Sequence, residues 1–130
     1  MNGYIANIED LTLKNEDFRR VLYTGKNSQL VLMSIALGED IGEETHHLDQ
    51  FLRFEKGQGK VILDGVESAV EDGSAVVIPA GTKHNVINVG EEPLKLYSIY
   101  SPPEHKDGVV HHTKADALAN EEHFDGKTTE

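Results

Sequence analysis

Side chains that could ligate a metal or move a proton gather in the segment GEETHHLDQ, residues 42–50. Glu44, His46, His47 and Gln50 supply a carboxylate, two imidazoles and an amide. Imidazole and oxygen donors together suit divalent ions such as Mn, Fe, Ni, Co or Zn. A carboxylate or an imidazole can also act as a general acid or base. The segment is therefore either half of a metal site or a polar corner of the fold.

The run over residues 45–55 has the composition of a β-strand, in which side chains alternate between two faces. Glu44, His46 and Gln50 then share a face with Phe54, which must point into a core. Burying three polar groups costs several kcal/mol unless they find partners. One metal ion would satisfy them together, and a hydrogen-bonded polar interior without metal is the alternative.

Short apolar runs separated by turn residues fill the chain between residues 18 and 100. The turns are rich in Gly, and Asp64-Gly65 is a strong two-residue hairpin signal. Many short strands at regular spacing predict an all-β sandwich or barrel. The expected strands span residues 18–24, 29–37, 45–55, 60–63, 66–70, 75–78, 84–89 and 94–100.

The strands divide the chain into a central barrel and two flanking arms. No clear hydrophobic period is visible over residues 4–17, whereas Thr113 is expected to cap one short helix over residues 114–122. The predicted parts are an N-terminal strand or arm segment (1–28), the β-barrel (29–101) and a C-terminal arm with a short helix (102–130).

Composition narrows the function classes. The net charge of −11 opposes phosphate backbones and anionic membranes, so we expect no nucleic-acid or membrane partner. The chain has no cysteine and no visible secretory signal, which favours a cytoplasmic protein. The runs 30–37 and 75–78 are apolar on both faces, so part of the outer face must be covered. A homodimer is favoured over a second layer formed by the N-terminal segment.

Two segments resemble the motifs of the cupin family. The segment 73–88 matches the second motif, G-x5-P-x-G-x2-H-x3-N, at every fixed position: Gly73, Pro79, Gly81, His84 and Asn88. The segment 38–57 is similar to the first motif, G-x5-H-x-H-x3-E-x6-G, but Glu44 replaces the first histidine and Gln50 the glutamate. The resemblance covers residues 30–100 and implies a cupin-type double-stranded β-helix, or jelly-roll, barrel.

The resemblance also implies a ligand set for one divalent transition metal (Fe, Mn, Zn or Ni). By position the ligands are Glu44, His46, Gln50 and His84, and their net charge equals that of the family pattern. A β-bulge would bring in His47 as an alternative to His46. Glu44 is in addition the candidate catalytic acid or base.

The implied function is a metal-dependent enzyme, an oxygenase, isomerase or lyase, acting on a small polar metabolite. The alternative is a non-catalytic cupin that binds a small ligand such as a sugar, with structural metal or none. A sugar phosphate would need a cationic clamp, and inward cations are scarce, since alternation turns Lys83 away. The tail histidines are lid residues or solvated surface groups: His105, His111, His112 and His123.

Overall fold

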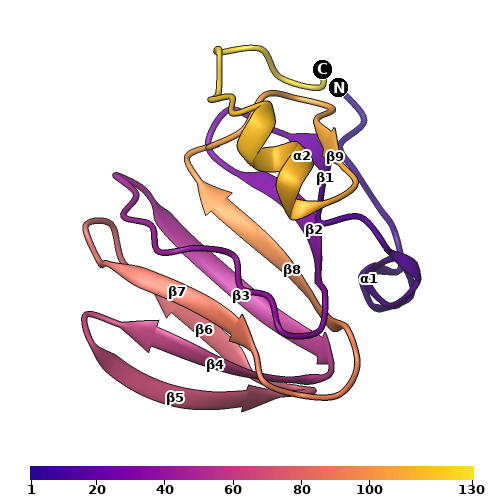
Figure 1. Cartoon of the computed structure of the whole chain (residues 1–130). Helices are drawn as coiled ribbons and strands as arrows, with labels where there is room; N and C mark the ends of the chain where they lie inside the picture. Colours follow the sequence, from indigo (N-terminus) through magenta and orange to yellow (C-terminus); the bar gives the residue numbers. More distant parts are fainter.

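Two antiparallel β-sheets face each other, with one short helix beside the larger sheet and a second over the upper end of the barrel in the view of Figure 1. This computed structural model describes residues 1–130. The six-stranded sheet has the order β6-β3-β8-β2-β1-β9, and the three-stranded sheet has the order β5-β4-β7. The elements are α1 (Ile8–Lys14), β1 (Arg19–Thr24), β2 (Gln29–Ile35), β3 (Asp49–Lys56), β4 (Gln58–Leu63), β5 (Val66–Glu71), β6 (Ala75–Ile78), β7 (His84–Asn88), β8 (Leu94–Ser101), β9 (Val110–His111) and α2 (Lys114–Ala119).

The predicted jelly-roll barrel is confirmed, and each of the eight expected strands is present. Asp64 and Gly65 join β4 to β5 with φ angles of 47° and 84°, which is the left-handed geometry that a two-residue hairpin turn requires. The largest error in a strand boundary is in β3, because the strand expected over residues 45–55 begins only at Asp49. The preceding residues leave β3 and cross to the other sheet, where Glu44 forms an isolated bridge with His84.

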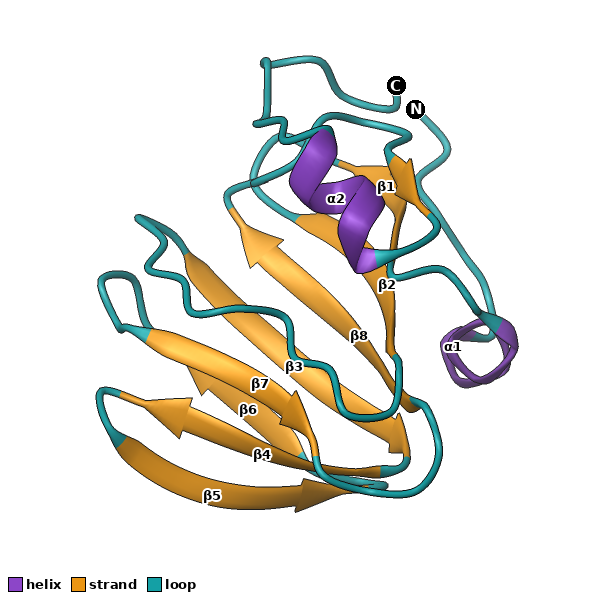
Figure 2. Cartoon of the chain, in the orientation of Figure 1, coloured by secondary structure: helices purple, strands orange, loops and turns teal.

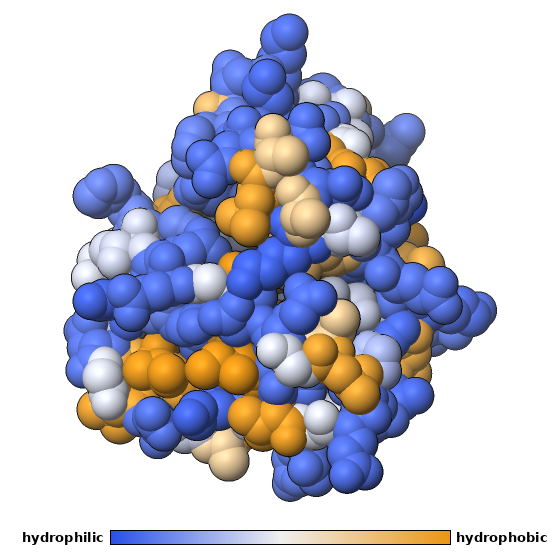
Figure 3. Space-filling view, in the orientation of Figure 1, coloured by the Kyte–Doolittle hydropathy of each residue, from blue (hydrophilic) through white to orange (hydrophobic).

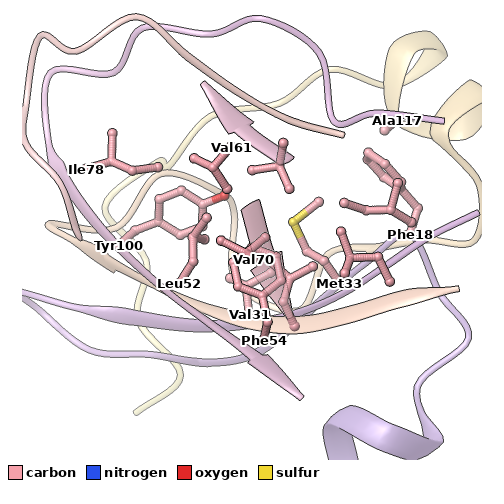
Figure 4. Close-up of a cluster of buried hydrophobic side chains, with 14 of the residues drawn as sticks. Phe18, Val31, Met33, Leu52, Phe54, Val61, Val70, Ile78, Tyr100 and Ala117 are labelled. Atoms are coloured by element: carbon pink, nitrogen blue, oxygen red, sulfur yellow. The ribbon is translucent and has the colours of Figure 1, made fainter. Parts of the chain in front are cut away.

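The core fills the space between the two sheets. It is a cluster of sixteen buried residues, among which Leu52, Phe54 and Leu96 are completely buried. Figure 4 shows this cluster with Tyr100 and Ile78 on one side and Phe18 and Ala117 on the other. Helix α2 therefore contributes to the same core as the strands.

Helix α1 was not predicted. It is only seven residues long, and it is held at its start by Asn7, whose side chain accepts from the backbone N–H of Asp10. The helix packs against β8, β3 and β2. On the outer face of β2, Leu32 is 2% exposed although it lies outside the core cluster. The N-terminal segment thus covers part of the outer face, as a helix and not as a sheet layer.

Helix α2 begins where the sequence predicted. Thr113 Oγ1 accepts from the N–H of Asp116 at 3.1 Å, which caps the first turn. The helix ends at Ala119, earlier than the predicted residue 122. Figure 2 shows it crossing the end of the barrel beside β1. Neither helix is long and apolar enough to cross a membrane.

Candidate functional site at the mouth of the barrel

Backbone pairing between the two sheets sets the position of Glu44. Its N–H donates to the carbonyl of His84, and the N–H of His84 donates to the carbonyl of Glu44, both at 2.9 Å. This two-bond bridge places the carboxylate beside β7, which strand alternation along β3 could not have predicted. The first and second motif segments therefore meet at Glu44 and His84.

Glu44 and His46 form an ion pair in which His46 Nε2 lies 2.8 Å from Glu44 Oε2. Burial alone would raise the pKa of Glu44, but the hydrogen bond and the charge of His46 lower it overall. Burial alone would lower the pKa of His46, and Glu44 reverses that shift and raises it. The His46 side chain is 10% exposed, whereas His47 is an exposed residue. The structure therefore turns His46, and not His47, towards the site.

The ring of His84 is oriented so that its Nε2 could bind a metal ion. Its Nδ1 lies 2.9 Å from the carbonyl oxygen of Thr82, which fixes the proton of a neutral ring on Nδ1. The lone pair then lies on Nε2, which is the arrangement that metal-binding histidines use. The ring centroid of His84 is 5.1 Å from that of His46.

Gln50 lies in β3, and its amide is buried. Its Nε2 donates to Ser98 Oγ at 3.0 Å, while its Oε1 has no hydrogen-bond partner. Tyr100 is opposite Gln50 in the sheet, and the Tyr100 ring lies 5.9 Å from the ring of His46 and 5.2 Å from that of His105. Burial raises the pKa of Tyr100, so its hydroxyl stays protonated.

Unpartnered polar atoms concentrate around this site. Five buried side-chain atoms in the chain lack a hydrogen-bond partner, although buried polar groups are nearly always paired. One of them, Arg53 Nε, belongs to a side chain that is 39% exposed. The other four are His46 Nδ1, Gln50 Oε1, Arg19 Nε and His105 Nε2.

A cleft of about 260 Å³ opens between the barrel and α2. Arg19 and Glu44 line it from the barrel, Glu104 and His105 from the segment after β8, and Lys114 from α2. Lys114 also forms an ion pair with Asp40, which ties the helix to the rim of the barrel. The cleft therefore reaches Glu44 from solvent.

Arg19 was missed by the sequence analysis, which expected inward cations to be scarce. It is 8% exposed, and it pairs in the sheet with the core residue Met33. Strand alternation could not have predicted this. Phe18 and Val21 are both core residues, but one is even-numbered and the other odd-numbered, so they give opposite answers for which face of β1 points inward. Lys83 does point away, as expected, and it pairs with Glu43 on the surface.

The residues fit a divalent metal by donor chemistry, although no three His, Asp or Glu side chains are arranged to hold one. His84 offers Nε2, Gln50 offers an unpartnered oxygen, and Glu44 and His46 bond to each other. Glu44 and His46 would have to exchange that mutual bond for bonds to the ion. Metal binding by this set therefore stays a prediction.

Comparison with known proteins agrees with the fold and the motifs. The family model described as "Cupin domain" matches residues 31–100, which is more than half of the chain. The chain belongs to the cupin family. This cupin is 52% identical over 126 residues to the Bacillus subtilis protein YrkC, described as uncharacterized, with 92% of this chain and 68% of YrkC covered.

Two further relatives support the assignment. The uncharacterized protein L612 of Acanthamoeba polyphaga mimivirus is 43% identical over 113 residues, covering 82% of this cupin and 70% of L612. The crystal structure of BH2720 from Bacillus halodurans superposes with a TM-score of 0.90 at 53% identity, covering 92% of this cupin and 96% of BH2720.

The remaining motif residues of this cupin are structural. Asn88 Nδ2 donates to the carbonyls of Ile35 and Glu92, and its Oδ1 accepts from the N–H of Gly90, so Asn88 ties the ends of two strands together. Gly57 has a φ of 95°, and a Cβ there would lie 2.9 Å from the carbonyl oxygen of Pro93. Asn88 and Gly57 therefore stabilise the barrel and are not among the candidate site residues.

Proposed function

We propose that this cupin is a metal-dependent enzyme acting on a small polar metabolite in the cleft beneath α2. The proposed ligands of one divalent transition metal (Fe, Mn, Zn or Ni) are Glu44, His46, Gln50 and His84. The observation that supports this proposal is the group of four unpartnered buried polar atoms, two of which belong to Arg19 and His105 in the lining of a cleft that also contains Glu44. Buried polar atoms without partners are costly unless a ligand or ion completes them.

When bound, a divalent ion supplies polarisation of a carbonyl or hydroxyl oxygen or, as Fe, a site for O₂. The side chains of the site would supply the proton transfers. Glu44 is held ionised, so its carboxylate can accept a proton, and His46 Nε2 bonds to that carboxylate. Burial raises the pKa of Tyr100, so its hydroxyl keeps its proton and can donate a hydrogen bond.

A second candidate is a metal-free cupin that binds a small neutral ligand such as a sugar. The Glu44–His46 bond supports it, because these two groups satisfy each other without an ion. Carboxylates and imidazoles are also suitable partners for sugar hydroxyls. In either case we propose a cytoplasmic protein with no nucleic-acid partner, because the chain is strongly acidic and has no cysteine.

Elemental analysis of the purified protein tests the metal proposal. We expect about one transition metal per chain in the wild type and loss of it in His84→Ala, because the variant would lack one of the two imidazole donors of the proposed ligand set. The matched control is His47→Ala, which removes an exposed histidine of the same segment and should keep the metal. Absence of metal from the wild type after reconstitution with Fe, Mn, Zn and Ni would favour the metal-free candidate.

A further inference from the structure

Arg19 is a buried cation with no anionic partner. Its Nη1 lies 3.2 Å from His111 Nδ1, and its guanidinium lies 5.3 Å from the centre of the Phe18 ring. No carboxylate lies within 4.0 Å of it, and its Nε has no hydrogen-bond partner. The next residue, Arg20, is exposed and pairs with Asp17 at 2.8 Å. The buried arginine is thus the unpaired one of the two.

An arginine in this position is costly to the folded protein. The guanidinium cannot lose its proton, and a buried charge without a counter-ion is destabilising by several kcal/mol. The nearby carboxylates are already bonded elsewhere: Glu44 to His46, Glu104 to His123, and Glu122 to His105 and the N–H of Lys106. The charge of Arg19 is offset only at a distance, by Glu44 and Glu122, and the guanidinium is free to bond directly to an anion from outside the chain.

His105 also lines this cleft and has an unpartnered buried atom, Nε2. Its Nδ1 lies 3.0 Å from Glu122 Oε1, so Nδ1 carries the proton and donates it to the carboxylate. Burial lowers the pKa of His105 in spite of this bond, and the ring is neutral. Nε2 is then an acceptor, which a hydroxyl group can satisfy.

We propose that Arg19 and His105 form a substrate subsite for a small carboxylate that carries a hydroxyl group. The carboxylate pairs with Arg19, and the hydroxyl donates to His105 Nε2. This inference rests on the proposed function, because it names the class of substrate that the proposed enzyme would bind. The ligand would lie in the 260 Å³ cleft, with Glu44 in the same cleft.

The charge of the cleft favours a carboxylate over a phosphate. Five glutamates line it against two cations, Arg19 and Lys114, and Lys114 is already paired with Asp40, so a dianion would meet more repulsion than a monoanion. One guanidinium also matches one carboxylate, with two parallel N–H···O bonds. The lining glutamates are Glu43, Glu44, Glu104, Glu121 and Glu122.

Titration with three small probes, followed by NMR of the arginine Nε–H signals, tests the subsite. Lactate carries both groups, propionate lacks the hydroxyl and lactamide lacks the charge. We expect lactate to shift the Arg19 signal and to bind more tightly than propionate, and lactamide not to bind. Inorganic phosphate binding more tightly than lactate, or lactamide binding as well as lactate, would overturn the inference.

Two neighbouring variants provide the matched comparison. Arg19→Gln should weaken lactate binding by about tenfold or more, the loss of one charge-assisted contact, whereas Arg20→Gln should leave it unchanged. Arg19→Met should be at least as resistant to urea as the wild type, because it removes a buried unpaired charge. Equal lactate affinity in Arg19→Gln and the wild type, or a clear loss of stability in Arg19→Met, contradicts the subsite.

Metal content separates this inference from the proposed function. If the wild type contains metal and Arg19→Gln binds lactate as tightly as the wild type, the proposed metal enzyme is supported and the subsite is contradicted. If the wild type contains no metal and lactate binding depends on Arg19, the subsite is supported and the proposed metal enzyme is contradicted.

Discussion

At the scale of single residues, Gln50 occupies the position at which the family motif has a glutamate. Its amide is tied to Ser98 by one end only, and the free oxygen has no partner. Without an ion, an unpartnered neutral amide at this buried position costs less than a carboxylate, which would be an unpaired charge. We therefore expect Gln50 to favour the stability of the metal-free protein over affinity for the proposed metal.

The variant Gln50→Glu tests this balance. Without metal it should unfold at lower urea concentration than the wild type, because the new carboxylate is buried. With Zn or Mn it should regain stability and bind the ion about tenfold more tightly, since a carboxylate is the stronger donor. Chemical denaturation and calorimetric titration measure the two effects. Gln58→Glu, an exposed change on β4, is the control and should show neither.

At the scale of elements, one side chain from the sheet fastens α1 to the barrel. Lys95 in β8 is 8% exposed, and its Nζ donates to the carbonyls of Leu13 at 2.9 Å and Asn15 at 2.7 Å. The carbonyls at the end of a helix have no partner within the helix, and a cation there also complements the helix dipole. A seven-residue helix is too short to form alone, so this contact helps to keep it folded.

Lys95→Met should therefore release α1. We expect a loss of about 1.5–3 kcal/mol in the free energy of unfolding, the range for hydrogen bonds that involve a charged group. Amide hydrogen exchange should show faster exchange in α1 than in the barrel strands. Lys14→Met changes an exposed lysine of the same helix and should have little effect on either measurement. Unchanged exchange in α1 would mean that packing alone holds the helix.

The C-terminal arm contains a pH-sensitive contact. Burial lowers the pKa of His105 below its ordinary value of 6.5, although Glu122 and Glu104 oppose this and Arg19 adds to it. The folded protein therefore binds fewer protons at His105 than the unfolded chain. The contribution of His105 to stability is present above pH 6.5 and is lost as the pH falls through the folded-state pKa.

The wild type should accordingly be less stable in urea at about pH 5.5 than at about pH 7.5. His105→Gln should reduce that difference, because the variant has no proton to bind at this position. His123→Gln removes an exposed histidine that faces Glu104, and it should not reduce the difference. An equal pH dependence in wild type and His105→Gln would show that other groups cause it.

At the scale of the whole molecule, an apolar surface is exposed beside β5 and β6, which are edge strands of the two sheets. Residues of β4, β5 and β6 line a groove there, and Val66 and Val77 are 67% and 64% exposed. Figure 3 shows an apolar patch at the lower left, over the sheet that contains β4 and β5. Both β5 and β6 are outer strands of their sheets, and such edges are usually protected by a partner or by charge.

The predicted homodimer would bury this groove against a second copy. We expect the wild type to sediment as a dimer and Val77→Glu to sediment as a monomer, because a carboxylate in the interface would be buried unpaired. Val89→Glu, at an exposed valine outside the groove, should leave the dimer intact. A monomeric wild type in analytical ultracentrifugation would contradict the expectation.

The sequence by itself determined the barrel. Gly-rich turns and period-two apolar runs act over a few residues, so they predicted eight strands, the Asp64-Gly65 hairpin and the Thr113 cap without knowledge of distant contacts. The fixed positions of the second motif identified the family for the same reason. Patterns of this kind are encoded by neighbours along the chain.

The tertiary structure decided the rest, because those features depend on residues far apart in the sequence. Glu44 is positioned by backbone bonds to His84 in the other sheet, and not by the alternation of β3. Arg19 points inward because of its register against Met33, and α1 is held by Lys95. A local pattern carries no information about which distant strand a segment will meet. The site therefore forms only where the two sheets face each other.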